Sequence, residues 1–181
     1  MKYKICVSGS ATDNCLPEAF DKAREIGREV IRQDGVIVTG ATIGIPREAA
    51  KGAKEENGFS IGISPASSKR EHLKKYRLPL DYMDLVIFTG MDYSGRNLIL
   101  IRATDASIFI CGRIGTLNEF TIAFEDKKPI GILTGTGGVA EEIEEILDVA
   151  QRGHGKVVID DDPKRLVDKV MEMVRYEHDI E

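Results

Sequence analysis

The chain has 181 residues, of which 42% are hydrophobic and 30% are charged, and its net charge at pH 7 is -5. These proportions exclude a disordered or fibrous protein, and a chain of this length can bury a sizeable core. A net negative charge lacks the electrostatic footprint of a nucleic-acid-binding protein. No apolar run reaches the roughly 18 residues that cross a bilayer. We therefore expect a cytoplasmic protein that binds neither membrane nor nucleic acid.

The three cysteines are Cys6, Cys15 and Cys111. An odd number at wide spacings fits neither a disulfide framework nor a zinc site. We predict free thiols at all three positions.

Short runs of β-branched residues alternate along the chain with longer stretches of helical period. The predicted strands are residues 3–7, 36–39, 59–64, 85–89, 107–110, 130–134 and 157–159. The predicted helices are residues 17–33, 46–56, 94–104, 116–127 and 135–152, followed by a terminal helix with Asp162 as its N-cap and Pro163 as its first residue. Between the third and fourth strands the regular pattern lapses in a connection that is basic from Lys69 to Arg77.

This alternation predicts an α/β fold: a three-layer, Rossmann-like domain with a mostly parallel sheet of six to seven strands and helices on both faces. No linker or repeat divides the chain, so we expect one domain over residues 1–181. Ligands of such sheets bind beyond the carboxyl ends of the strands. Five turns are therefore expected to line one crevice, at Gly9, Gly40, Gly90, Gly112 and Gly135.

The most informative stretch is residues 111–119, which reads Cys-Gly-Arg-Ile-Gly-Thr-Leu-Asn-Glu and joins a predicted strand to a predicted helix. Gly112 and Gly115 free the backbone to wrap an anion, and Thr116 adds a hydroxyl donor at the helix start. A phosphate is the natural ligand. Glu119 is expected one helical turn further on, and Arg96 is expected to approach from the neighbouring helix.

A purely structural interpretation of these residues remains open. Thr116 and Glu119 have the spacing of a capping box, in which both side chains satisfy backbone N–H groups. Arg96 is, on the same view, a solvated or salt-bridged helix residue. Similarly, Ser8, Gly9 and Ser10 form either ligand contacts or a plain tight turn.

The chain resembles the LOG-like nucleotide-binding superfamily, which includes cytokinin-activating phosphoribohydrolases once labelled lysine decarboxylases. The loop of that superfamily is P-G-G-x-G-T-x-x-E, of which this sequence keeps Gly112, Gly115, Thr116 and Glu119. Gly40 and Gly44 match part of its earlier glycine-rich turn, and Arg96 stands where its arginine accompanies the glutamate. Three positions depart from the pattern, where Cys111 replaces a proline and Arg113 and Ala41 replace glycines.

Within the superfamily, the chain is more similar to the branch that contains molybdenum cofactor carrier proteins. The similarity lies in the dipeptide Arg96-Asn97 and in the turn Gly135-Thr136-Gly137-Gly138. This branch implies a non-catalytic carrier or sensor of a nucleotide-like cofactor such as molybdopterin.

The wider superfamily implies a phosphoribohydrolase that cleaves the N-glycosidic bond of a nucleoside 5′-monophosphate. Arg96 and Glu119 would then be catalytic, because a carboxylate can stabilise a ribosyl cation or activate water. The expected ligand-binding residues are Gly9, Ser10, Gly40, Gly44, Gly112, Arg113, Gly115 and Thr116. The reaction requires no metal or cofactor, and no lysine has the surroundings that a pyridoxal phosphate decarboxylase needs.

The remaining chemically active residues have plainer interpretations. His72, His154 and His178 lie in polar contexts and are predicted at the surface. The run from Asp160 to Asp162 is interpreted as an acidic helix cap rather than a cation site. The basic connection is interpreted as a solvated face, with contact to phosphate or nucleic acid as the alternative. The family's usual self-association implies a homodimer or a higher homo-oligomer, for which Leu98 and Ile122 belong to candidate interface stripes.

Overall fold

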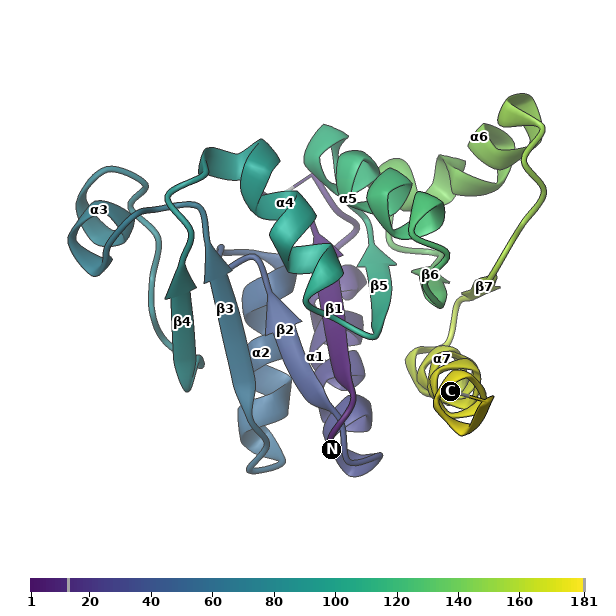
Figure 1. Ribbon diagram of the computed structural model, residues 1–181, viewed down its shortest axis with the longest axis horizontal. Helices are drawn as coiled ribbons and strands as arrows, with labels where there is room; N and C mark the ends of the chain where they lie inside the picture. The colour runs from purple at the N-terminus through teal and green to yellow at the C-terminus, as the bar shows by residue number, and fades with distance from the viewer. Residues whose placement is uncertain (13, 181) are drawn as a thin grey trace.

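Seven parallel strands form one sheet in the order β4-β3-β2-β1-β5-β6-β7, with helices on both of its faces (Figure 1). This computed structural model describes residues 1–12 and 14–180. The strands are β1 (Lys4–Gly9), β2 (Val36–Thr39), β3 (Ser60–Ser64), β4 (Leu85–Phe88), β5 (Ala106–Ile110), β6 (Ile130–Leu133) and β7 (Val157–Asp160). The predicted α/β, Rossmann-like fold is confirmed.

The helices follow the strands in regular alternation. They are α1 (Glu18–Arg32), α2 (Ile45–Glu55), α3 (Lys69–Lys74), α4 (Asp92–Arg102), α5 (Ile114–Glu125), the 3-10 helix η1 (Gly138–Glu142), α6 (Ile143–Ala150) and α7 (Pro163–Ile180). Within the described part of the chain, none of them combines the length and apolar character of a membrane-spanning segment.

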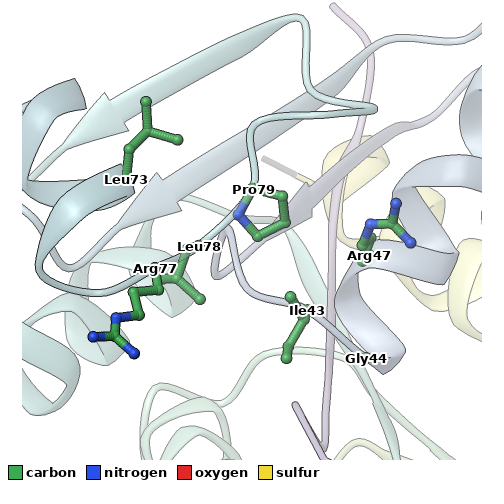
Figure 2. Close-up of a pocket in the computed structure, with 7 residues that line it drawn as sticks. All are labelled: Ile43, Gly44, Arg47, Leu73, Arg77, Leu78 and Pro79. Carbon is green, nitrogen blue, oxygen red and sulfur yellow. The ribbon is translucent and has the colours of Figure 1, made fainter.

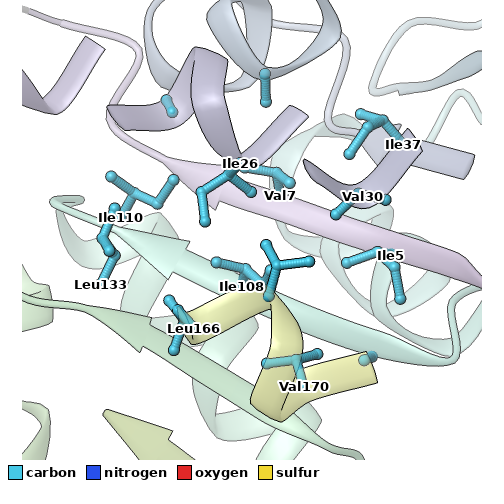
Figure 3. Close-up of a cluster of buried hydrophobic side chains, with 14 of the residues drawn as sticks. Ile5, Val7, Ile26, Val30, Ile37, Ile108, Ile110, Leu133, Leu166 and Val170 are labelled. Atoms are coloured by element: carbon cyan, nitrogen blue, oxygen red, sulfur yellow. The ribbon is translucent and has the colours of Figure 1, made fainter. Parts of the chain in front are cut away.

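Side chains that alternate along the strands divide the core into two layers. Ile5 and Val7 of β1 point to the layer covered by α1, α2 and α7, where they meet Ile26 and Val170 (Figure 3). Cys6 of the same strand points to the opposite layer, which α4, α5 and α6 cover. Because both faces are covered, the central strands read as continuous apolar runs rather than as alternating ones.

The direction in which successive strands are added to the sheet changes between β1 and β5, although all strands run parallel. The strands β1 to β4 extend to one side of this point, and β5 to β7 extend to the other. The last residue of β1, Gly9, lies opposite Ile110, the last residue of β5. Loops leave such a switch point in opposite directions, and ligands of open α/β sheets bind there. We call the region at the carboxyl ends of β1 and β5 the crevice.

Helix α3 lies in the connection that was expected to lack regular structure. Ser68 is its N-cap, and its hydroxyl accepts a hydrogen bond from the Glu71 backbone N–H at 3.2 Å. Ser68 and Glu71 have the spacing of a capping box, which is the local signal for this helix. Lys69, Arg70 and Lys74 are exposed, so most of the basic connection is the solvated face that was predicted.

The prediction that His72 lies at the surface is wrong, whereas His154 and His178 are exposed as predicted. The imidazole of His72 is fully buried on the inner side of α3. Its Nε2 donates to the Pro79 carbonyl at 3.0 Å, and its Nδ1 accepts from the Ser64 hydroxyl at 2.8 Å. A polar sequence context hid this role, because His72 is the one residue of α3 that turns towards the sheet.

The acidic run before the last helix is a cap, as predicted. Asp162 accepts a hydrogen bond from the Arg165 backbone N–H at 2.8 Å. Asp160 pairs with the side chains of Arg165 and Lys169 at 2.7 Å, and the hydrogen bond from Arg165 is the main reason that its pKa is lowered.

Candidate functional site

The turn after β5 has the backbone of an anion-binding loop. Cys111 and Gly112 adopt left-handed conformations with φ values of 54° and 95°, and α5 begins at Ile114. A Cβ atom at Gly112 would lie 2.5 Å from Cβ of Thr116, so this position requires glycine. The first N–H groups of a helix have no partner within it, and no side chain of the N-cap residue Arg113 occupies them. They are therefore available to a ligand.

Gly115 and Arg113 leave the mouth of this loop open. A Cβ atom at Gly115 would meet no atom within 4 Å, so packing does not explain a glycine there. Arg113 is extended and exposed. Thr116 is buried and lies under Gly112. The side chains of Arg113 and Ile114 are thus exposed beside the turn, and the side chain of Thr116 is buried beneath it.

The glycine-rich turn after β6 supports the loop from outside. The Thr136 hydroxyl accepts a hydrogen bond from the Cys111 N–H at 2.9 Å. The N–H groups of Val139 and Ala140 donate to the carbonyls of Gly112 and Cys111 at 3.0 and 2.9 Å. These three bonds fix the loop before any ligand arrives. The predicted helix over residues 135–152 is correspondingly shorter, because its first part forms this support.

A disulfide bond joins Cys15 to Cys111, with their Cα atoms 5.7 Å apart. The prediction of free thiols at these two positions is wrong, and it holds only for Cys6, which is free and buried. Cys15 lies in the loop after β1, and 96 residues separate the two cysteines in sequence. The sheet topology brings them together, because the loops after β1 and β5 leave neighbouring strands.

The side chains of Arg96 and Glu119 face each other inside the molecule. Arg96 Nη1 lies 3.1 Å from Glu119 Oε1, and the two side chains are only 5% and 8% exposed. Arg96 comes from α4, Glu119 comes from the second turn of α5, and the hydroxyl of Ser8 in β1 donates to Glu119 Oε2. The three elements therefore meet at one buried carboxylate.

Gly40 makes room for this pair. A Cβ atom there would lie 2.2 Å from Arg96 Nη1, which explains why the turn after β2 carries a glycine at this position. Asn97 adds a further contact that the sequence interpretation missed. In the amide orientation that suits its neighbours, its nitrogen donates to Glu119 Oε1 at 2.8 Å and to the Tyr93 carbonyl at 2.9 Å.

The capping-box interpretation of Thr116 and Glu119 is wrong. Helix α5 begins two residues before Thr116, and the Glu119 carboxylate bonds to Ser8 and Arg96. Of the two alternatives for Arg96, the solvated one is wrong and the salt-bridged one is found, because the side chain is buried and paired with Glu119.

Burial dominates the electrostatics of this cluster. It raises the pKa of Glu119, while the Arg96 charge and the hydrogen bond from Ser8 act in the opposite direction. Burial also raises the pKa of the Cys6 thiol, which lies near Glu119 and Arg96. Arg96 Nε is buried with no hydrogen-bond partner among the described residues. Such an orphaned donor is costly unless a ligand or water satisfies it.

Gly9, Ser10 and Gly44 form the adjoining wall of the crevice. A Cβ atom at Gly9 would lie 2.4 Å from the Ile110 carbonyl oxygen, and one at Gly44 would lie 2.3 Å from the Ser10 carbonyl oxygen. Both glycines therefore permit close approach of backbones. Ser10 is buried, and its hydroxyl bonds to Asn14 within the loop after β1.

Comparison with known proteins identifies a family and a shared fold. The sequence model of the SLOG cluster4 family matches residues 2–167. An uncharacterized protein of Archaeoglobus fulgidus is 30% identical over 119 residues, which cover 66% of this chain and 73% of that protein.

Solved structures cover nearly the whole chain. The molybdenum cofactor binding protein of the phototrophic bacterium Rippkaea orientalis is 26% identical, covers 98% of both chains and has a TM-score of 0.76. The molybdenum cofactor carrier protein of Chlamydomonas reinhardtii is 24% identical with a TM-score of 0.79 over 97% of this chain and 99% of that chain, and shows the same fold.

Proposed function

The chain belongs to the SLOG cluster4 family, and on this basis we propose that it binds a phosphate-bearing, nucleotide-like small molecule in the crevice between β1 and β5. The observation that carries the proposal is the Arg96 guanidinium, which is buried beside Gly40 and whose Nε has no hydrogen-bond partner among the described residues. A buried guanidinium with unused donors is suited to an anionic ligand.

The loop from Gly112 to Thr116 is the proposed phosphate site. The backbone N–H groups at the start of α5 and the positive end of its dipole favour an anion. Gly115 lets the ligand approach the backbone, and Arg113 reaches it from the rim. Gly9, Ser10, Gly40 and Gly44 shape the rest of the crevice.

We propose the molybdenum cofactor as the cargo, with the protein as its carrier. The cofactor's pterin bears a phosphate, which matches the loop. The similarity over 98% of the chain to the molybdenum cofactor binding protein of Rippkaea orientalis supports this choice. A carrier needs binding residues but no bond-breaking group, and the closed environment of Glu119 agrees with a positioning role for that carboxylate.

Hydrolysis of a nucleoside 5′-monophosphate is the second candidate, favoured by the raised pKa of Glu119. A carboxyl group whose pKa lies nearer to neutrality can transfer a proton to a leaving base or accept one from water. Arg96 would hold that group and the ligand in place. The products would be the free base and ribose 5-phosphate.

One experiment separates the two candidates. Purified protein is titrated with AMP and with the isolated molybdenum cofactor by calorimetry, and released adenine is measured in parallel. The carrier proposal predicts tight binding of the cofactor and no adenine release. Hydrolysis predicts adenine release that Glu119→Gln abolishes. Binding of neither ligand would contradict both.

A further inference from the structure

A second hollow lies on the carboxyl edge of the sheet, between the start of α2 and the chain that follows α3. Its volume is about 510 Å³. Figure 2 shows Ile43, Leu78 and Pro79 at its centre, with Arg47 and Arg77 on opposite sides. Apolar side chains together with a few polar or charged groups are typical of small-molecule binding sites.

We call this hollow the ring pocket. One contact already described and three further contacts hold parts of its walls. Buried His72 holds the segment from Leu78 to Pro79, because Leu78 N–H donates to the His72 carbonyl at 3.1 Å and His72 Nε2 donates to the Pro79 carbonyl. Arg47 donates through Nε to Asp81 at 2.9 Å and lies 5.0 Å from the centre of the Tyr82 ring. These contacts fix the Leu78–Pro79 segment and Arg47, whereas Ile43, Leu73 and Arg77 line the open side of the hollow with exposed side chains.

Arg77 is the cation in this pocket that remains available. It has no ion-pair partner within the described ranges, whereas the charge of Arg47 is matched by Asp81. Its backbone is left-handed with a φ value of 55°, a conformation that costs about 1–2 kcal/mol for a residue other than glycine. The fold thus holds an exposed guanidinium at the edge of an apolar pocket.

The ring pocket adjoins the crevice through Gly44. Gly44 lines the pocket and also contacts Ser10, to whose carbonyl the Ile45 N–H donates at 2.9 Å. Ser10 directly follows β1 at the crevice. The pocket is lined by the connections after β2 and β3, which lie two and three strand spacings from β5, or about 10–15 Å. This span exceeds a phosphate and requires a phosphate joined through a linker to a ring system.

We infer that the ring pocket holds the heterocycle of the same ligand whose phosphate lies in the loop from Gly112 to Thr116. This inference rests on the proposed function and adds the place in which the fused ring of the purine or pterin type is bound. The apolar side chains would cover one face of the ring. Arg77 would stack on the ring or hydrogen bond to its carbonyl oxygen.

The test is calorimetric titration with GMP and with ribose 5-phosphate. Guanine shares its 2-amino-4-oxopyrimidine ring with pterins, and ribose 5-phosphate lacks the ring. We expect GMP to bind at least about tenfold more tightly, equivalent to about 1.4 kcal/mol. Ile43→Gln and Arg77→Gln should each remove most of this difference and leave the affinity for ribose 5-phosphate unchanged.

Arg70→Gln is the matched control, because Arg70 is an exposed arginine of α3 that does not line the pocket. Ile43 and Arg77 are also exposed, so the variants should keep the melting temperature of the wild type. Equal affinities for the two ligands, or unchanged GMP binding in both pocket variants, would refute the proposal that the ring pocket binds the heterocycle. The proposed phosphate site would not be affected by either result. Failure of the wild type to bind either ligand would refute the phosphate site and the ring pocket together.

Discussion

The buried ion pair of Arg96 and Glu119 contributes to stability as well as to the proposed binding site. Removing one member of such a pair typically costs about 3–5 kcal/mol, because the other charge stays buried without compensation. We therefore expect Arg96→Met to lower the free energy of unfolding by about this amount at pH 8. The double variant Arg96→Met/Glu119→Gln should regain much of the loss. Denaturant unfolding of the two single variants and the double variant measures this coupling.

The raised pKa of Glu119 predicts the direction of a pH effect. A carboxyl group with a higher pKa in the folded state binds its proton more readily when folded, so its contribution to stability is present at low pH and is lost as pH rises through the folded pKa. The free energy of unfolding of the wild type should therefore fall relative to that of Glu119→Gln as pH rises above about 4.3, the unperturbed pKa of a glutamate. Unfolding curves at several pH values test it, and a shift in the opposite direction would show that the ion pair outweighs burial.

His72 is predicted to be a structural residue whose loss loosens the ring pocket. His72→Ala removes two buried hydrogen bonds and leaves a cavity, so we expect a loss of about 2–4 kcal/mol in the free energy of unfolding. His154→Ala, at an exposed histidine, is the control and should change stability by less than about 0.5 kcal/mol. Equal stabilities of the two variants would contradict the bracing role.

At the scale of elements, the start of α5 should show binding and stability moving in opposite directions. Gly115→Ala adds a methyl group that meets nothing within 4 Å and favours helix over coil by up to about 1 kcal/mol. We expect a higher melting temperature together with weaker binding of AMP, since the methyl group would occupy the proposed phosphate position. A variant with raised stability and unchanged AMP affinity would place the ligand elsewhere.

The disulfide between Cys15 and Cys111 should stabilise the two loops that flank the crevice. A bond closing a loop of this length contributes up to about 4–5 kcal/mol, mainly by restricting the unfolded chain. Dithiothreitol should lower the melting temperature of the wild type and leave the melting temperature of the Cys15→Ser variant unchanged. Titration of the unfolded, unreduced wild type should find one thiol, that of Cys6; three thiols would mean that the bond is absent.

Sequence patterns predicted most elements because the central strands are short apolar runs between helices of clear period. They failed where tertiary contacts decide the outcome. His72 is buried by a helix too short to show periodicity, and the two bonded cysteines meet only through the order of the strands. The capping-box interpretation failed because α5 starts at Ile114, directly after a loop that the Thr136 hydroxyl holds at the Cys111 N–H.

At the scale of the whole molecule, all seven strands share one sheet, which supports the proposal that residues 1–181 form a single domain. The expected self-association stays a prediction. Leu85 and Ile87 of β4 and Leu98 of α4 are exposed apolar side chains that a second copy could cover. Light scattering coupled to size-exclusion chromatography should give at least twice the mass of 20.0 kDa. A monomer at every concentration would contradict the prediction.

The central claim is that the crevice between β1 and β5 binds phosphate through the start of α5. A crystal structure of the protein grown with AMP tests it most directly. We predict phosphate oxygens within about 3 Å of the backbone N–H groups at the start of α5, with the Arg96 guanidinium turned towards the ligand. A phosphate bound at any other edge of the sheet, with the N–H groups of Gly115 and Thr116 facing only water, would contradict the account.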